Sequence, residues 1–283
     1  QIQETTVDLT SMMERMMGEM AEGEETHEDG KIYSNNIMTD MLTVLADKKQ
    51  TNNLEELKKY IDEGNNGISD NANAIKYDYN LNLNLYRTDT SNGIVKVNPS
   101  TVMEKLGMQQ SGMAMGSDCF TELLDNQELN DSQYDVVAGN WPQNYNEVVL
   151  IVDENNKISD YTLYTLGIKD QKELEEKMDA IQNDEKLADE QTSYTYDDLL
   201  KLSFKVLLNT DYYEKANNMW IDKSDDEEYM KEKVDNAEEI KVVGIIKQKE
   251  GSISTQTAGE IGYLKTLKEH VINKINEQEI VKE

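Results

Sequence analysis

The chain has 283 residues, which is enough for one large or two ordinary domains. Its 28 basic and 57 acidic residues give a net charge of −29, whereas a nucleic-acid binder needs clustered cations that displace counterions from phosphates. Nucleic-acid binding is therefore excluded. We favour the interpretation that the acidic surface keeps the protein soluble. The alternative interpretation is that it attracts cationic ligands, such as antimicrobial peptides, to an outer cell surface.

A single cysteine, Cys119, excludes an intramolecular disulfide framework, which fits a reducing cytoplasm and equally the exterior of a Gram-positive cell. No stretch approaches the ~20 apolar residues that cross a bilayer as a helix. The longest apolar run, Val148–Val152, has the length of a strand. The sequence opens on Gln1 without a visible signal peptide, so we expect a piece of a longer protein whose membrane anchors, if any, lie outside it.

The first segment predicts a helix and then an acidic loop over residues 21–31. Ser11 and Glu14 form a capping box, so a helix is expected to begin here. Its methionines share one side at helical spacing: Met13, Met16, Met17 and Met20. We favour adaptable core packing for this stripe over a promiscuous binding face, because exposed apolar patches are rare.

Two amphipathic helices are expected next, around residues 37–45 and 54–61. The second has Asn52 and Glu55 as its expected cap pair and Gly64 just past its end.

Residues 75–86 alternate apolar and polar side chains, which predicts one long half-buried strand. Asn92-Gly93 indicates a tight turn, so residues 94–97 should return beside that strand. A capping box from Thr101 to Glu104 predicts a short helix, and the Gly/Met/Ser-rich stretch 107–118 predicts a mobile loop. We place a soft boundary between this loop and about residue 131.

The second half of the chain alternates strands and helices. Strands are expected at 147–153, 203–208 and 240–246, and helices near 158–166, 170–182, 226–235 and 263–281. The pattern predicts an α+β fold with mixed or antiparallel sheets, packed helices and two subdomains.

The groups that catalysis needs do not converge in this sequence. His27 and His270 are the only histidines, and they lack the paired spacing of a zinc site or a local nucleophile partner. Carboxylates are so abundant that no pair of them is informative, and the scarcity of Trp and Phe argues against a sugar site. We therefore expect no catalytic residue, no metal ligand and no enzyme activity.

Two apparent ligand motifs fail on their chemistry. Gly107 and Gly112 have the spacing of a phosphate loop, but Met113-Ala114 stands where Lys and Ser/Thr are needed. Asp153 opens a stretch like a calcium loop, but Lys157 stands where an oxygen ligand is required. The acidic run 225–228 is more simply the N-terminal turn of a helix. No cofactor is therefore expected.

Residues 131–153, DSQYDVVAGNWPQNYNEVVLIVD, are similar to a signature of MacB-like ABC-transporter permeases of the FtsX/MacB type. In that family the signature lies in an extracytoplasmic domain between the first and second membrane helices. Three further strings resemble the family in the same order: ISDYTLYTLG at 158–167, IKVVGII at 240–246 and GEIGY at 259–263. The opening, IQETTVDLT, resembles the extracellular exit of the first membrane helix in Gram-positive members.

The resemblance implies four parts. They are an N-terminal helix and acidic loop leading from a membrane helix (1–32), a helical and β-hairpin elaboration that matches the family poorly (33–130), a MacB-like core (131–265) and a C-terminal helix (266–283). Its motif positions, which are structural, are Gly139, Trp141, Pro142, Asn146, Glu147, Gly167, Gly244 and Gly259. Family domains continue into a further segment before the second membrane helix, so part of the domain is expected to lie outside this chain.

The implied function is that of an extracellular permease domain at the cell membrane. It would couple cytoplasmic ATP hydrolysis to extracytoplasmic movement or export of peptides or lipophilic compounds, known as mechanotransmission. The implied partners are an ABC ATPase, fused or separate, a second permease subunit in a homodimer or heterodimer, and cationic peptides. The alternative is a free-standing secreted binding or adhesion protein, and the intact gene discriminates the two by the presence or absence of flanking membrane helices. A third class, a secreted hydrolase, would require a pocket where a histidine meets a nucleophile or several carboxylates converge.

Overall fold

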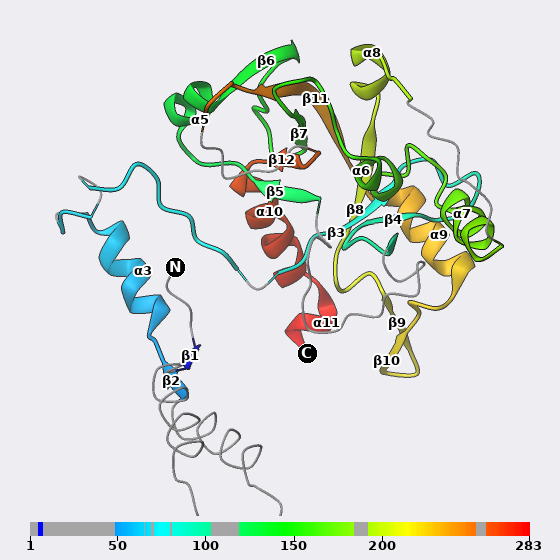
Figure 1. Ribbon diagram of the computed structural model, residues 1–283. Helices are drawn as coiled ribbons and strands as arrows, with labels where there is room; N and C mark the ends of the chain where they lie inside the picture. The colour runs from blue at the N-terminus through cyan, green and yellow to red at the C-terminus, as the bar shows by residue number, and fades with distance from the viewer. Residues whose placement is uncertain are drawn as a thin grey trace, which may run out of the picture. The chain divides into compact units, whose positions relative to one another are not determined.

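The computed structural model describes residues 5–7, 49–64, 66–68, 71–79, 81–102, 119–183, 192–252 and 259–283 (Figure 1). The chain divides into two compact units, unit 1 (Gln1–Ala72) and unit 2 (Asn73–Glu283). The expected Met-rich helix, the acidic loop, the helix around 37–45 and the 107–118 loop lie outside the described residues, as does most of the helix expected from Thr101.

Unit 1 contains a short strand pair and one amphipathic helix. Strands β1 (Thr5–Val7) and β2 (Lys49–Thr51) pair antiparallel, and α3 spans Leu54–Asp62. The helix was predicted, but its cap was placed one residue too early. Asn53, rather than Asn52, is the N-cap, and its side chain accepts a hydrogen bond from the Glu56 backbone N–H at 3.1 Å.

Unit 2 is built on one mixed sheet. Its strands, in spatial order, are β4 (Lys96–Asn98), β3 (Asn84–Arg87), β8 (Ser203–Leu207), β11 (Glu238–Gln248), β7 (Glu147–Val152), β12 (Ile261–Tyr263) and β5 (Phe120–Glu122). The β7–β11 and β5–β12 pairs are parallel and the other pairs are antiparallel. The predicted α+β class with mixed sheets is confirmed.

Strand β11 organises this sheet because three strands share its two edges. β7 runs parallel along one edge. On the other edge β8 pairs with the first residues of β11, and β6 (Tyr134–Gly139) pairs with its last residues, both antiparallel. A separate hairpin follows β8, formed by β9 (Tyr213–Ala216) and β10 (Met219–Asp222).

The helices of unit 2 pack around the sheet (Figure 1). They are α5 (Gln127–Gln133), α6 (Asp160–Thr165), α7 (Lys172–Gln182), α8 (Tyr196–Leu199), α9 (Glu227–Asn236), α10 (Lys265–Asn276) and α11 (Glu279–Lys282). Helices α6, α7 and α9 confirm the predicted ones. The single terminal helix expected over 263–281 is instead two helices, since α10 ends at Asn276 and α11 begins at Glu279.

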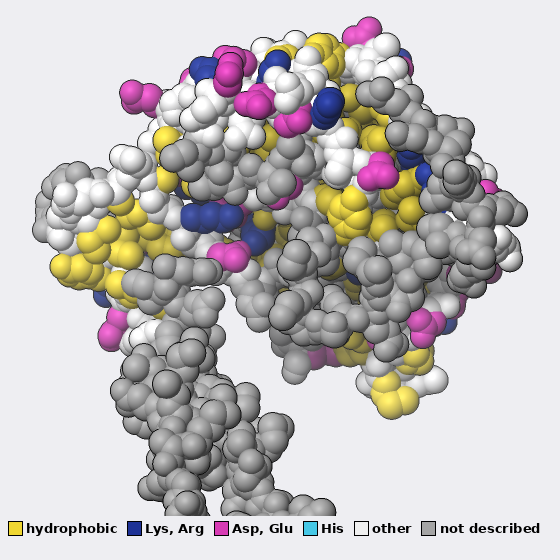
Figure 2. Space-filling view, in the orientation of Figure 1, with side chains coloured by type: hydrophobic (Ala, Val, Ile, Leu, Met, Phe, Trp, Pro, Cys, Tyr) yellow, Lys and Arg dark blue, Asp and Glu magenta, His cyan; other side chains and the backbone are white. Residues whose placement is uncertain are grey.

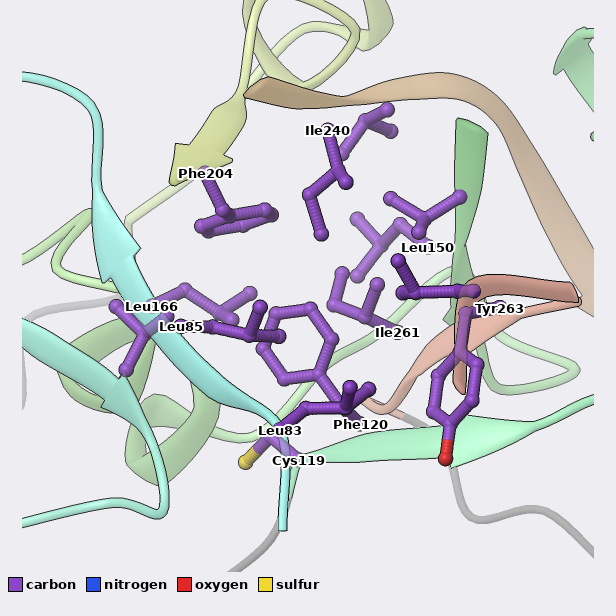
Figure 3. Packing of buried hydrophobic residues seen from close by; sticks show 14 of the residues in the cluster. Leu83, Leu85, Cys119, Phe120, Leu150, Leu166, Phe204, Ile240, Ile261 and Tyr263 are labelled. Atoms are coloured by element: carbon purple, nitrogen blue, oxygen red, sulfur yellow. The ribbon is translucent and has the colours of Figure 1, made fainter. Parts of the chain in front are cut away.

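The apolar run in β7 is explained by burial on both faces of the sheet. Val148, Leu150 and Val152 belong to the main core, whereas Val149 and Ile151 belong to a second cluster with Leu123, Tyr134 and Ile246. In the main core, side chains from β8, β11 and β7 point toward one another, among them Phe204, Ile240 and Leu150 (Figure 3). Phe204 also meets Phe120 of β5 edge-on, with ring centroids 5.2 Å apart.

The long strand predicted over 75–86 is wrong for most of its length. Only Asn84–Arg87 forms a strand, β3, and Ile75 and Tyr79 are 37% and 40% exposed. The paired register of β3 with β8 and β4 covers only residues 84–87, so the alternating residues before it do not join the sheet. The turn expected at Asn92-Gly93 is confirmed, since the chain returns as β4 beside β3.

Candidate functional site

The candidate site is the turn between β6 and β7, residues 140–146, with the strand and helix that it contacts. Gly139, the last residue of β6, lies directly opposite Gly244 of β11. A Cβ on Gly139 would lie 2.1 Å from the Val243 carbonyl oxygen, and one on Gly244 would lie 2.1 Å from the Asn140 carbonyl oxygen. Gly139 also has φ +66°, a left-handed conformation that disfavours a side chain. The two strands therefore approach to a separation that only a pair of glycines allows.

The side chain of Glu147, the first residue of β7, stabilises the turn through hydrogen bonds. Its carboxylate accepts hydrogen bonds from the backbone N–H groups of Gln143 at 2.6 Å and Asn144 at 3.0 Å, and from the Asn144 side-chain amide at 3.0 Å. These donors favour the ionised form, chiefly the Gln143 N–H, and hold the pKa of Glu147 below its ordinary value. The Asn146 carbonyl accepts from the Lys241 backbone N–H at 2.9 Å, which fastens the end of the turn to β11.

Trp141 and Pro142 secure the other end of the turn. The indole of Trp141 meets the ring of Tyr134 edge-on, with centroids 6.4 Å apart, and packs on the second core cluster with Val149 and Ile151. Pro142 is buried. The turn is therefore held by its own carboxylate, by β11 and by an aromatic contact, which makes it a rigid extension of the sheet.

A cluster of four side chains joins this turn to helix α10, and we call it the α10 clamp: Tyr145, Glu238, His270 and Lys274. The ring of Tyr145 stacks on the His270 imidazole, with centroids 3.9 Å apart and planes inclined by 17°. Glu238, at the start of β11, lies 2.7 Å from His270 Nε2 through Oε2 and 3.6 Å from Lys274 Nζ through Oε1. The Tyr145 hydroxyl also reaches Glu238 at 3.4 Å.

The electrostatics of the clamp centre on the Glu238 carboxylate. Partial desolvation, followed by the negative charge of Glu238, raises the pKa of Tyr145, so the phenol stays protonated and can donate. Turn, strand and helix thus meet at one acidic group.

The two remaining predicted glycines lie at helix α6 rather than at the turn. Gly167 follows Leu166, the C-cap of α6, and its carbonyl accepts a hydrogen bond from Arg87 Nη1 of β3 at 2.7 Å. A Cβ on Gly259 would lie 2.4 Å from the Thr162 hydroxyl oxygen of α6. Six of the eight predicted positions therefore gather around the β6–β7 turn and β11, and two connect α6 to its neighbours.

The sequence did not indicate the clamp. Tyr145 lies inside the quoted signature but carried no assigned role, and Glu238, His270 and Lys274 belong to no motif. His270 was considered only as a zinc ligand or a catalytic group. Because 32 residues separate Glu238 from His270 and 93 separate it from Tyr145, no local spacing could have revealed their contact.

The described part of the chain offers little for ligand chemistry. It contains no group of three or more His, Cys, Asp or Glu side chains that could hold a metal ion. Asp153 Oδ1 accepts hydrogen bonds from the backbone N–H groups of Asn155 and Lys157, so this carboxylate closes its own turn. Asp226 is the N-cap of α9, which confirms the helix-end interpretation of that acidic run.

Cys119 is buried and His27 lies outside the described residues. Of the helices that the structure describes, none has both the length and the apolar character that crossing a bilayer demands. In comparisons with family models, curated proteins and solved structures, the chain matches none of them. The function is therefore proposed from the sequence resemblance together with the geometry of the site.

Proposed function

We propose that the chain is the extracytoplasmic domain of a MacB-like ABC-transporter permease, and that it transmits motion rather than catalysing a reaction. The observation that carries this proposal is the α10 clamp, which connects the C-terminal helix to the β6–β7 turn and to β11. A domain that couples ATP hydrolysis on one side of a membrane to movement on the other needs such a connection between its membrane-proximal end and its sheet.

The contacts suit this role because their strengths differ. The turn is held by backbone pairing, a glycine pair and three hydrogen bonds to Glu147. The clamp consists of a ring stack, a hydrogen bond between His270 and Glu238, and an ion pair between Lys274 and Glu238, whose side chain is 46% exposed. Exposed ion pairs contribute about 0–1 kcal/mol each. A displacement of α10 would therefore open or shift the clamp before it distorted the sheet.

In this proposal the parent protein lies in the cell membrane with unit 2 on the outer side. An ABC ATPase, fused or separate, drives it together with a second permease subunit. The cargo would be peptides or lipophilic compounds, and the net charge of −29 favours cationic peptides as ligands on electrostatic grounds.

The location is tested by labelling the intact protein in whole cells with a membrane-impermeant maleimide. Glu154→Cys places a thiol on an exposed turn, while the only native cysteine, Cys119, is buried. We expect labelling of intact cells at Glu154→Cys and little in the native protein. Labelling only after cell lysis overturns the proposal. An intact gene without flanking membrane helices also overturns it and favours a secreted binding protein.

The coupling is tested with Tyr145→Ala in the membrane-bound transporter. The variant removes the ring stack on His270, so we expect transport or peptide resistance to fall while ATP hydrolysis persists. Val136→Ala on β6 is the matched control, because Val136 is an exposed apolar residue outside the clamp. Equal transport by the two variants would show that the clamp has no part in coupling. Measurable ATP affinity of the isolated chain would also count against the assignment.

A further inference from the structure

Residues 73–79, which we call the strap, are the first residues of unit 2 and follow unit 1 directly. They form neither a helix nor a strand, although the alternation of their side chains favours a strand. Contacts from two other elements hold them instead. The side-chain amide of Asn126, the N-cap of α5, donates a hydrogen bond to the Asn73 carbonyl at 2.8 Å. Lys268 of α10 binds Asp78 at 2.7 Å.

The ion pair between Asp78 and Lys268 joins a surface side chain to a buried one. The Asp78 side chain is 67% exposed, whereas that of Lys268 is 11% exposed. A buried ammonium group needs a charged partner because it has lost most of its hydration. Figure 2 shows dark blue Lys or Arg side chains beside magenta Asp or Glu side chains where Figure 1 draws the strap next to α10. Lys268 therefore holds the strap against α10.

A second buried charged group, Glu122 of β5, lies beside this pair. Four charged side chains from the strap and from α10 act on its carboxylate: Lys76, Asp78, Lys268 and Glu269. Lys265 of α10 also pairs with Asp125, which follows β5. The strap, β5 and α10 therefore meet in one cluster of opposite charges.

The strap lies on the side of α10 that faces away from the clamp. Lys268 and His270 are two residues apart, so they point to different sides of the helix. Leu267 and Val271, which are buried in the main core, lie between them on the helix surface. Helix α10 therefore contacts the β6–β7 turn on one side and the strap on the other.

The next buried attachment of the chain after the strap is Leu83. The strap begins at Asn73, which is bound beyond the C-terminal end of β5. Leu83 packs beside Phe120 at the N-terminal end of that strand (Figure 3). The Leu83 carbonyl also accepts a hydrogen bond from the buried Asn98 side chain at 2.7 Å. Leu83 is therefore held in unit 2 by contacts that do not involve the strap.

Release of the strap would lengthen the connection between the two units. With the strap bound, unit 2 holds the chain from Asn73 onward. Without these contacts it holds the chain only from Leu83, ten residues later. Because an extended chain spans at most ~3.3–3.6 Å per residue, release adds up to about 35 Å of reach.

We propose that the strap is a releasable connection that sets how far unit 1 can move from unit 2. An ion pair suits this role, because the exposed Asp78 regains water on release whereas β3 stays paired in the sheet. The closed state is favoured, since opening leaves the buried Lys268 without this partner. The inference concerns only the two units of this chain and does not depend on the permease assignment.

Release is measured in the 283-residue chain by the rate of trypsin cleavage after Lys76, which follows the population of the open strap. Lys268→Met keeps an apolar stem and removes the ammonium group. We expect about tenfold faster cleavage in this variant, because hydrogen bonds to charged groups are the stronger ones. Lys249→Met removes another ion pair, that of Lys249 with Asp135, and should leave the rate unchanged.

Two results of this digestion overturn the inference. One is an equal rate of cleavage after Lys76 in Lys268→Met and its parent. The other is an equal rise after Lys205 of β8, because the ion pair would then stabilise the whole fold rather than the strap.

The gain in reach is measured by the distance between spin labels at Glu56→Cys on α3 and Glu154→Cys in unit 2, both exposed positions. The only native cysteine, Cys119, is buried. Asp78→Ala removes the exposed partner of the ion pair, so we expect its distances to extend by up to about 35 Å beyond those of the parent. Asp135→Ala, a similarly exposed partner of Lys249, should reproduce the parent distances.

Identical distances in Asp78→Ala and the parent overturn the inference. Neither measurement needs a membrane or an ATPase, so a negative result leaves the permease assignment as it stands. Conversely, an intact gene without flanking membrane helices refutes that assignment and leaves the strap untouched.

Discussion

Replacing Gly244 by alanine is expected to destabilise unit 2 by about 2–4 kcal/mol. The new Cβ would lie 2.1 Å from the Asn140 carbonyl oxygen, against the 3.4 Å or more of an ordinary contact, so the backbones must separate by roughly an ångström. Overpacking of this kind costs about 1–3 kcal/mol. The movement also weakens the hydrogen bond from the Asn140 N–H to the Val243 carbonyl, which contributes about 1 kcal/mol more.

Urea unfolding, followed by the fluorescence of Trp141 in a Trp220→Phe background, measures this loss beside the glycine pair. Gly251→Ala is the matched control, because Gly251 has φ +72° but no atom within 4 Å of the position that a Cβ would occupy. That variant should lose only the cost of the left-handed conformation, about 1–2 kcal/mol. If Gly244→Ala lost less than about 0.5 kcal/mol, or less than Gly251→Ala, the close approach of β6 and β11 would not constrain the fold as described.

Three further predictions concern charge and the clamp. Glu147→Gln should lose about 1 kcal/mol at pH 7, because a partly exposed carboxylate with three donors is replaced by an amide. Since the pKa of Glu147 lies below its ordinary 4.5, its contribution is present above that pH and lost as pH falls through the folded pKa, so urea midpoints of variant and parent should converge in acid. A double-mutant cycle of Tyr145→Ala and His270→Ala should give a coupling energy of about 0.5–1.5 kcal/mol, and additive losses would contradict the ring stack. Burial raises the pKa of the Glu122 carboxyl above 4.5, so its contribution to stability is present below that pH and is lost as pH rises through the folded pKa. The stability of Glu122→Gln relative to the parent should therefore increase between pH 4 and pH 7. A stability difference that stays constant over this range would contradict the reasoning.

The helices and strands that depend on local sequence patterns could be predicted from the sequence. The runs in β7 and β11 are long and apolar, and the helices α6 and α9 begin at the side-chain caps Ser159 and Asp226. Such signals need no knowledge of distant residues, because a cap satisfies backbone groups within its own turn and an apolar run requires burial wherever it lies. The α+β class follows from their alternation along the chain.

The strand predicted over 75–86 shows where local patterns stop being sufficient. The alternation of side chains makes this stretch compatible with a strand, but a strand also needs a partner along its whole length. β8 and β4 pair only with residues 84–87, so the rest of the stretch stays outside the sheet.

The sequence by itself determined the class of the fold and its two longest buried strands, β7 and β11. Tertiary structure alone decided that Gly139 lies opposite Gly244, that Tyr145 stacks on His270, and that Lys268 binds Asp78. The physical reason is separation along the chain. Capping and periodicity act within a few residues, whereas these contacts join residues that approach only after β7 and β11 have paired.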